Sequence, residues 1–188
     1  LWIPEIDLGD GRVFLGFRDL MEVRVADAFI RRGMSAVRMR AAIALARGAL
    51  GRDHPLSTNN FRTDGQDIFL QVIETSEDGA ERTRLLNLFR RQYEFREVIE
   101  PLLSTVEFDE DGSPLLWWPE GREAGVLVDP ARSFGAPIEA ETSVPTSVLA
   151  MAARHSSMQD VAAAYAVPIA AVERALAYED RMEERKAA

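Results

Sequence analysis

The two histidines are the side chains in this sequence best suited to acid–base or metal chemistry, but their surroundings argue against both. His54 and His155 are about 100 positions apart, and neither has a ligand-type residue three or four positions further on. The sequence has no Cys, no Gly-rich phosphate loop and no nucleophile elbow. The carboxylates of "EFDEDG" at 107–112 are better explained as a solvated hairpin loop than as a metal site. We therefore expect structural or solvated histidines, no catalytic residue, no metal and no cofactor.

Phosphate binding is the chemistry that the N-terminal third favours. Residues 1–64 contain 10 Arg against 8 Asp and Glu, whereas the rest contains 12 basic and 23 acidic residues, and the net charge is −9. Because basic contacts to phosphate dominate affinity for nucleic acids, a DNA-facing surface is expected in this third. The alternative is a solvated helix face whose arginines pair with Asp19, Glu22 and Asp27. The candidate DNA-binding residues are Arg12, Arg18, Arg24, Arg31 and Arg38.

Apolar periodicity and capping residues predict the elements that would position these arginines. A short strand at 12–15 is expected, followed by a helix over 18–32 and a second helix over 36–50. Arg12 would then lie in a wing-like strand, where contacts to phosphate are common. The expected cap and stop residues are Gly16, Gly33, Ser35 and Gly51.

The middle of the sequence predicts a small α+β region. Turn residues and β-formers favour a strand at 67–73, and an apolar stripe favours a helix over 85–103. A hairpin of strands 106–109 and 114–118 and a further strand at 125–129 follow.

Two adjacent tryptophans, Trp117 and Trp118, lie in the second strand of that hairpin. Alternation along a strand sends the two rings to opposite faces. One ring could therefore contact a partner, where Trp is enriched, or both could be buried under different helices. Both residues are candidates for partner binding.

Beyond Pro130 the sequence predicts helices over 145–154, 158–165 and 168–182 and no strand. The stretch "SMQDVAAAYAVPIAAVERALAYED" at 157–180 has the spacing of a helix-turn-helix, but it holds four carboxylates and one Arg. A DNA-reading helix normally offers Arg, Lys, Asn or Gln to the DNA. We therefore favour a dimerising or protein-binding surface here, with Pro168, Ile169 and Val172 as its candidate residues.

Composition limits the class of protein. Apolar residues at 47% and charged residues at 28% are typical of a soluble globular protein, and no apolar run reaches the roughly 18 residues that cross a bilayer. Without Cys or a signal-peptide pattern, a cytoplasmic location and no membrane association are expected. The expected fold class is α+β and mainly helical. Three regions are expected, 1–64, 65–128 and 129–188, with further sequence upstream of Leu1.

Two stretches resemble known families. "FRDLMEVRVADAFIRRGMSAVRMRAAI" resembles the part of MerR-type winged-helix regulators that follows their helix-turn-helix, although the DNA-reading helix pair itself is not in this sequence. The residues that carry this resemblance are Phe17, Asp19, Leu20, Gly33, Met34 and Ser35.

The region from Val126 to Glu179 is similar to domain-of-unknown-function family 433, a trihelical, homeodomain-like module found in bacterial antitoxins. The family's usual Gly-Thr-Arg is replaced by Glu141-Thr142-Ser143 in this sequence. The matching positions are Asp129, Pro130, Phe134, Gly135, Pro137, Ile138, Val144 to Thr146, Asp160 to Ala162, Tyr165, Val167, Pro168, Val172, Ala175 and Leu176.

Together, the two resemblances imply a VapB-type antitoxin. Such a protein forms a homodimer, neutralises a PIN-domain ribonuclease toxin by direct binding and represses its own operon by binding operator DNA. One alternative is a MerR-like transcription regulator without a toxin partner. A third is an adaptor protein with no DNA-related role.

Overall fold

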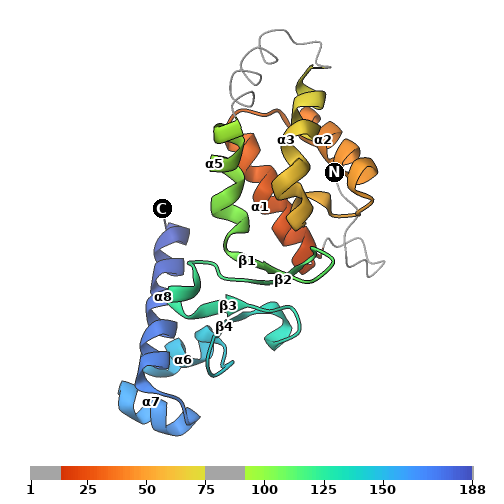
Figure 1. Cartoon of the computed structure of the whole chain (residues 1–188). Helices are drawn as coiled ribbons and strands as arrows, with labels where there is room; N and C mark the ends of the chain where they lie inside the picture. Colours follow the sequence, from red (N-terminus) through yellow and green to blue (C-terminus); the bar gives the residue numbers. More distant parts are fainter. Residues whose placement is uncertain (1–13, 75–91, 188) are drawn as a thin grey trace. The chain divides into compact units, whose positions relative to one another are not determined.

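The computed structural model describes residues 14–74 and 92–187, which fold into two compact units (Figure 1). The N-terminal unit comprises the chain up to residue 104 together with 108–114, and the C-terminal unit comprises 105–107 and 115–188. The described chain is mainly helical with one four-stranded antiparallel sheet, which confirms the α+β class. Along the chain, the first boundary between the units follows Ser104 and lies inside the central region expected at 65–128.

The first two helices form where the capping residues predict them. Helix α1 spans Phe17–Arg31 and α2 spans Ala36–Leu50. The backbone N–H of Gly16 donates to Asp19 Oδ2 at 2.9 Å at the start of α1, and Ser35 Oγ accepts from the Arg38 N–H at the start of α2. Gly33 and Gly51 have φ of 93° and 63°, as the left-handed ends of these helices require.

Helix α3 spans Asn59–Glu74, so the strand expected at 67–73 is wrong. Phe61, Gly65, Ile68 and Phe69 are buried and follow helical spacing. In the sequence, the dipeptide Asp64-Gly65 predicts a turn. In the structure Gly65 lies under the ring of Phe61, and a Cβ at Gly65 would be 2.6 Å from Phe61 Cε2. The glycine therefore permits close packing within a helix.

An aromatic cluster forms the centre of the N-terminal unit. Phe29 of α1, Phe61 and Phe69 of α3, and Phe95 of α5 are buried, with ring centroids 4.3–6.0 Å apart in the pairs that touch. Helix α5 spans Gln92–Leu103 and agrees with the expected helix there, while 85–91 lie outside the described residues. A short 3-10 helix, η1 (Pro55–Ser57), precedes α3.

The sheet runs in the order β1-β2-β3-β4. The expected hairpin is confirmed as β1 (Val106–Phe108) and β2 (Pro114–Trp117), and the next strand as β3 (Val126–Val128). Strand β4 (Pro137–Glu139) contradicts the expectation of no strand after Pro130. It is only three residues long and begins with Pro at the edge of the sheet, a position that tolerates a missing N–H, so its sequence signal is weak.

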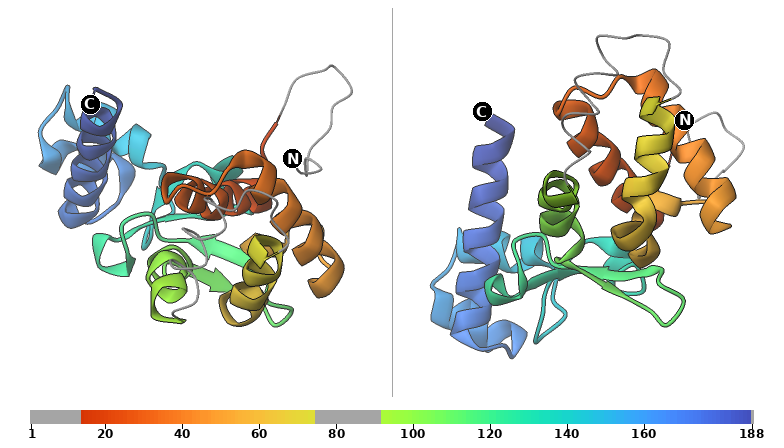
Figure 2. Two further views of the ribbon diagram at one scale, coloured as in Figure 1. Left: turned by 90° about the horizontal axis from the view of Figure 1, so that it is seen from above. Right: turned by 45° about the horizontal axis from the view of Figure 1, so that its top comes forward.

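Three helices complete the C-terminal unit: α6 (Thr146–Ala153), α7 (Met158–Tyr165) and α8 (Ile169–Ala187). They match the expected helices, and α8 continues past 182. Helices α6 and α7 pack against α8 (Figure 2), around a core of Leu149, Val161, Val167, Val172 and Ala175. Helices α7 and α8 are bent by 111° at the turn between them. In the described ranges, no single helix combines the length and apolarity to span a membrane; only this bent pair meets that test jointly.

Candidate functional site

The N-terminal arginines differ in how far they are available to a ligand. Arg18 and Arg31 are exposed, Arg38 is half-buried, and Arg12 lies outside the described residues. Arg31 Nε donates to Asp27 Oδ2 at 2.7 Å, so one pairing expected from the alternative interpretation is present. The Arg31 side chain is 77% exposed, and such surface pairs are weak. A phosphate could therefore compete with Asp27 for this guanidinium.

Arg24 is half-buried and differs from its exposed neighbours on α1. Its Nη1 lies 3.3 Å from the sulfur of Met21, and burial lowers the pKa of Arg24 to about 10. The group is still a cation at neutral pH, but it is packed within the unit. This placement argues against a direct phosphate contact by Arg24.

The carboxylates of Asp19 and Glu22 point to His54 rather than forming an open surface. All three side chains are buried, with His54 Nδ1 3.2 Å from Glu22 Oε2 and 3.5 Å from Asp19 Oδ1. Burial raises the pKa of Glu22, although the Leu56 N–H and His54 oppose this. His54 is thus a structural residue tying the start of η1 to α1. Over the described ranges, no cluster of His, Asp and Glu has the arrangement of a metal site.

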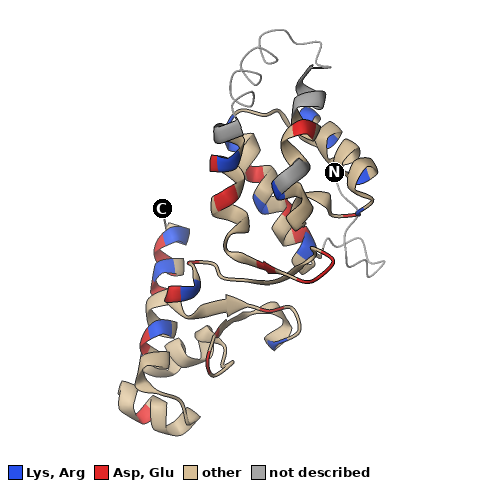
Figure 3. Cartoon of the chain, viewed as in Figure 1, with Lys and Arg blue, Asp and Glu red and all other residues tan. Residues whose placement is uncertain are grey.

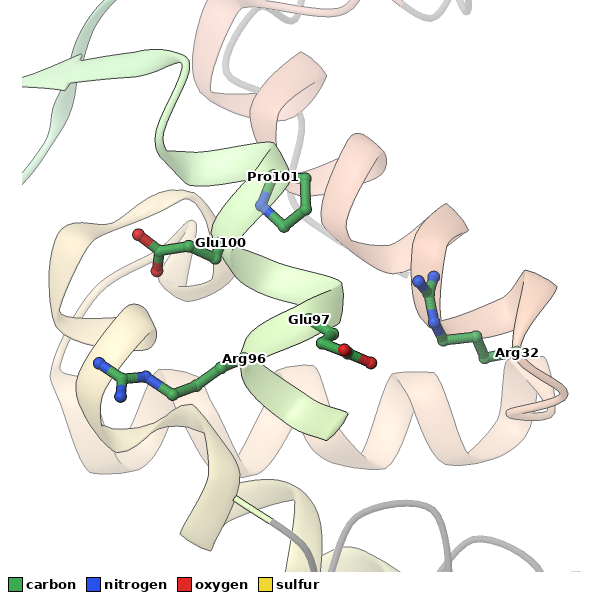
Figure 4. A pocket seen from close by; sticks show the side chains of 5 residues that line it. All are labelled: Arg32, Arg96, Glu97, Glu100 and Pro101. Carbon is green, nitrogen blue, oxygen red and sulfur yellow. The ribbon is translucent and has the colours of Figure 1, made fainter. Parts of the chain in front are cut away.

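A pocket of about 690 Å³ lies beside α5 (Figure 4). Its described lining carries both signs of charge, and Glu100 is already bound by Arg62, whose Nε donates to Glu100 Oε2 at 2.9 Å. The mixed lining selects neither anions nor cations, and we assign it no ligand. The described lining residues are Arg32, Arg96, Glu97, Glu100 and Pro101.

Trp117 and Trp118 are both half-buried. Trp118 Nε1 donates to Glu107 Oε1 at 2.7 Å, and the guanidinium carbon of Arg122 lies 5.4 Å from the centre of its ring. Trp117 is paired in register with Val128 of β3. The indole N–H of Trp118 and one face of its ring therefore already have partners within the unit. A partner contact by either tryptophan stays a prediction.

The turn between α7 and α8 forms a small apolar corner. Pro168 is exposed, and Ile169 and Tyr165 expose 42% and 41% of their surface. Val172, one turn further along α8, is completely buried in the core. Val172 is therefore not a surface residue, and its prediction as a direct partner contact is wrong. The helical period of 3.6 residues turns its side chain into the core, where it packs behind the corner.

Every arginine of the C-terminal unit forms an ion pair with a carboxylate of the same unit. The unit contains 12 Asp and Glu against 7 Arg and Lys, a balance of −5 (Figure 3). Nucleic-acid binding requires available cations, so this surface is better suited to a basic protein. The pairs are Arg122–Glu107, Arg132–Asp129, Arg154–Asp180, Arg174–Glu139, Arg181–Glu120 and Arg185–Glu120.

Sequence reasoning missed two features of this unit. Glu139 is buried and bound by Arg174, with Nη2 at 2.6 Å from Oε1, and Phe134 is completely exposed. The signal for Phe134 was a large aromatic residue beside Gly in a turn, "RSFG". The signal for Glu139 was absent, because an isolated Glu in a short strand normally faces solvent.

The fold has a counterpart among solved structures. The X-ray crystal structure of Rv2018 from Mycobacterium tuberculosis superposes with a TM-score of 0.68, covering 87% of this chain and 79% of that one. The two sequences are 24% identical, so the match shows a shared fold. No known family profile matches the chain.

One curated relative points to a biological role. The chain is 30% identical over 129 residues to the Mycobacterium tuberculosis (strain ATCC 25618 / H37Rv) protein named "Putative antitoxin VapB45". The match covers 66% of this chain and 54% of VapB45, so the chain spans about half the length of that relative. The similarity supports a relationship to VapB-type antitoxins.

Proposed function

We propose that this protein is the antitoxin of a type II toxin–antitoxin pair and that its toxin is a PIN-domain ribonuclease. The observation that carries the proposal is the 30% identity to VapB45 over 129 residues. An antitoxin of this kind acts stoichiometrically: it covers the toxin's active site or RNA path and needs no catalytic residue of its own.

The charge of the C-terminal unit supports a protein partner. A ribonuclease attracts RNA with a basic surface, and an acidic surface complements it. Because all six arginines of this unit already pair with carboxylates, its net charge of −5 is carried by the remaining acidic groups. The corner at Tyr165, Pro168 and Ile169 and the Trp117–Trp118 strand are the apolar contacts proposed for the toxin.

Autoregulation would use the other end of the chain. Arg18, Arg31 and Arg38, together with Arg12, are the proposed phosphate contacts of a MerR-like front bound to operator DNA. Two copies of the protein would bind the operator as a homodimer, and the trihelical module of 129–188 would be the toxin-binding and dimerising part. A cytoplasmic location follows from this function.

Co-expression with the product of the adjacent gene tests the proposal. The neighbour alone should arrest growth, the pair should grow normally, and the two proteins should co-purify. A harmless neighbour that does not associate with this protein would contradict the antitoxin role. If the protein then still bound its upstream DNA, the MerR-like regulator without a toxin would be the better interpretation.

A further inference from the structure

The loop between β3 and β4 presents Phe134 to solvent in an unfavourable backbone conformation. The side chain has 108% of its reference exposure, so it contacts almost nothing in this chain. Phe134 has φ 55° and ψ 31°, and its neighbours Ser133 and Gly135 have φ of 48° and 74°. Three successive residues therefore form a left-handed turn, which is rare for residues with a side chain and most unusual for a bulky one.

The loop is held in this shape by a defined set of bonds. Asp129 Oδ1 accepts from the Ala131 N–H at 2.8 Å, and Asp129 Oδ2 accepts from Arg132 Nε at 2.7 Å. Arg132 Nη1 in turn donates to Ser143 Oγ at 2.8 Å, and the Gly135 N–H donates to the Arg132 carbonyl. The ring of Phe134 is thus presented on a braced turn, which lowers the entropy lost when a partner binds it.

Folding alone does not explain a phenylalanine at this position. Gly or Asn adopts the left-handed region more readily, and an exposed ring gains nothing from burial in the isolated chain. A strained residue that the surrounding structure holds in place points to function. We infer that Phe134 is an anchor residue that inserts into an apolar pocket on the toxin, an inference that rests on the function proposed above.

Charge identifies the occupant as a protein. An exposed ring can also stack on a base, but single-strand binders combine such rings with cations that follow the phosphates. Arg132, the one cation of the 129–136 loop, is neutralised by Asp129, and the unit as a whole is acidic. A basic protein surface with an apolar pocket fits this combination of an aromatic anchor and carboxylates.

A second exposed apolar side chain belongs to the strand that pairs with β3. Strands β2 and β3 are antiparallel with Trp117 opposite Val128, the last residue of β3 before the loop. Leu115 of β2, two residues before Trp117, is 51% exposed.

Replacing Phe134 by Asn separates binding from folding. Asn tolerates the left-handed conformation, so the Tm of Phe134→Asn should equal or exceed that of the parent protein. Loss of a buried aromatic anchor should weaken binding of the full chain to the purified toxin by about 30-fold or more in calorimetry. Phe134→Tyr should retain binding within a few-fold. Val37→Ala, which alters an exposed apolar residue of α2 in the other unit, should leave affinity unchanged.

The outcomes separate this inference from the proposed function. If the parent protein binds the toxin and Phe134→Asn binds equally well, the anchor is disproved and the antitoxin role stands. If the parent protein does not bind the toxin, both fail. A lower Tm in Phe134→Asn would show a role in folding. Loss of self-association in light scattering, or loss of binding to single-stranded RNA, with toxin affinity unchanged, would assign the ring to another partner and overturn the inference.

Discussion

Arg174 of α8 donates two hydrogen bonds to one oxygen of Glu139 in β4, from Nη2 at 2.6 Å and from Nε at 3.0 Å. The second oxygen of Glu139 accepts from the N–H and the hydroxyl of Thr142 at 2.9 and 2.7 Å. The Glu139 side chain is completely buried, yet both of its oxygens are satisfied. This pair joins the last strand to the last helix within the C-terminal unit.

Removing the arginine should destabilise the C-terminal unit strongly. Arg174→Met leaves a buried carboxylate without its cation, and we expect the free energy of unfolding to fall by about 2–3 kcal/mol. This is at the low end for a buried ion pair, because the Arg174 side chain is partly exposed to solvent. Urea unfolding monitored by circular dichroism measures this. The control is Arg154→Met, whose pairs with Asp180 and Glu183 lie on the surface and which should leave the midpoint unchanged. Equal midpoints for both variants would contradict this account.

Glu139 should also make the protein sensitive to acid. Burial alone would raise the pKa of Glu139, but the hydrogen bonds from Thr142 and Arg174 outweigh it, and the pKa lies below its ordinary value. A depressed pKa contributes stability above the unfolded pKa of about 4.5, and this is lost as the pH falls below that value. The stability advantage of the parent protein over Glu139→Gln should therefore shrink between pH 5 and pH 3.

Glu22 should show the opposite pH dependence. Burial raises its pKa, so the folded protein holds this proton more tightly than the unfolded chain does. Its contribution to stability is then present at acid pH and falls as the pH rises from about 4.5 through the folded pKa. Relative to Glu22→Gln, the parent protein should lose stability as the pH rises over this interval. A difference between the two proteins that does not vary with pH would contradict the raised pKa.

The local signals that the sequence carries explain which elements could be predicted. Helices α1, α2 and α7 have caps and stops that act within one turn of the chain, so their bounds follow from the sequence. Gly65 led to a wrong prediction of a turn and a strand. Its role is to allow close contact with the Phe61 ring, and this contact exists only once the helix has formed. The burial of Arg24 and the contact between Glu22 and His54 could not be predicted for the same reason. Both depend on how segments that are distant in the sequence pack together.

The arginines of α1 can be distinguished by the salt dependence of DNA binding. Changing an exposed phosphate contact should weaken binding to the upstream DNA and reduce the slope of log affinity against log salt by about one. We expect this for Arg31→Ala and for Arg18→Ala. Arg24→Met, which alters a packed side chain, should leave the slope unchanged. A reduced slope for Arg24→Met with unchanged slopes for the two exposed residues would reverse this assignment.

The corner between α7 and α8 offers a matched pair of substitutions one helical turn apart. Ile169 is exposed and Val172 is buried. Ile169→Gln should leave unfolding unchanged but weaken toxin binding by about tenfold or more, because it places a polar amide in an apolar contact. Val172→Ala should instead destabilise the unit by about 2 kcal/mol through lost burial and a small cavity, and the folded fraction should still bind the toxin normally. Thermal unfolding and calorimetric titration with the toxin measure the two effects separately. If Ile169→Gln binds like the parent protein, the corner is not part of the toxin interface, and the contact must lie elsewhere on the acidic unit.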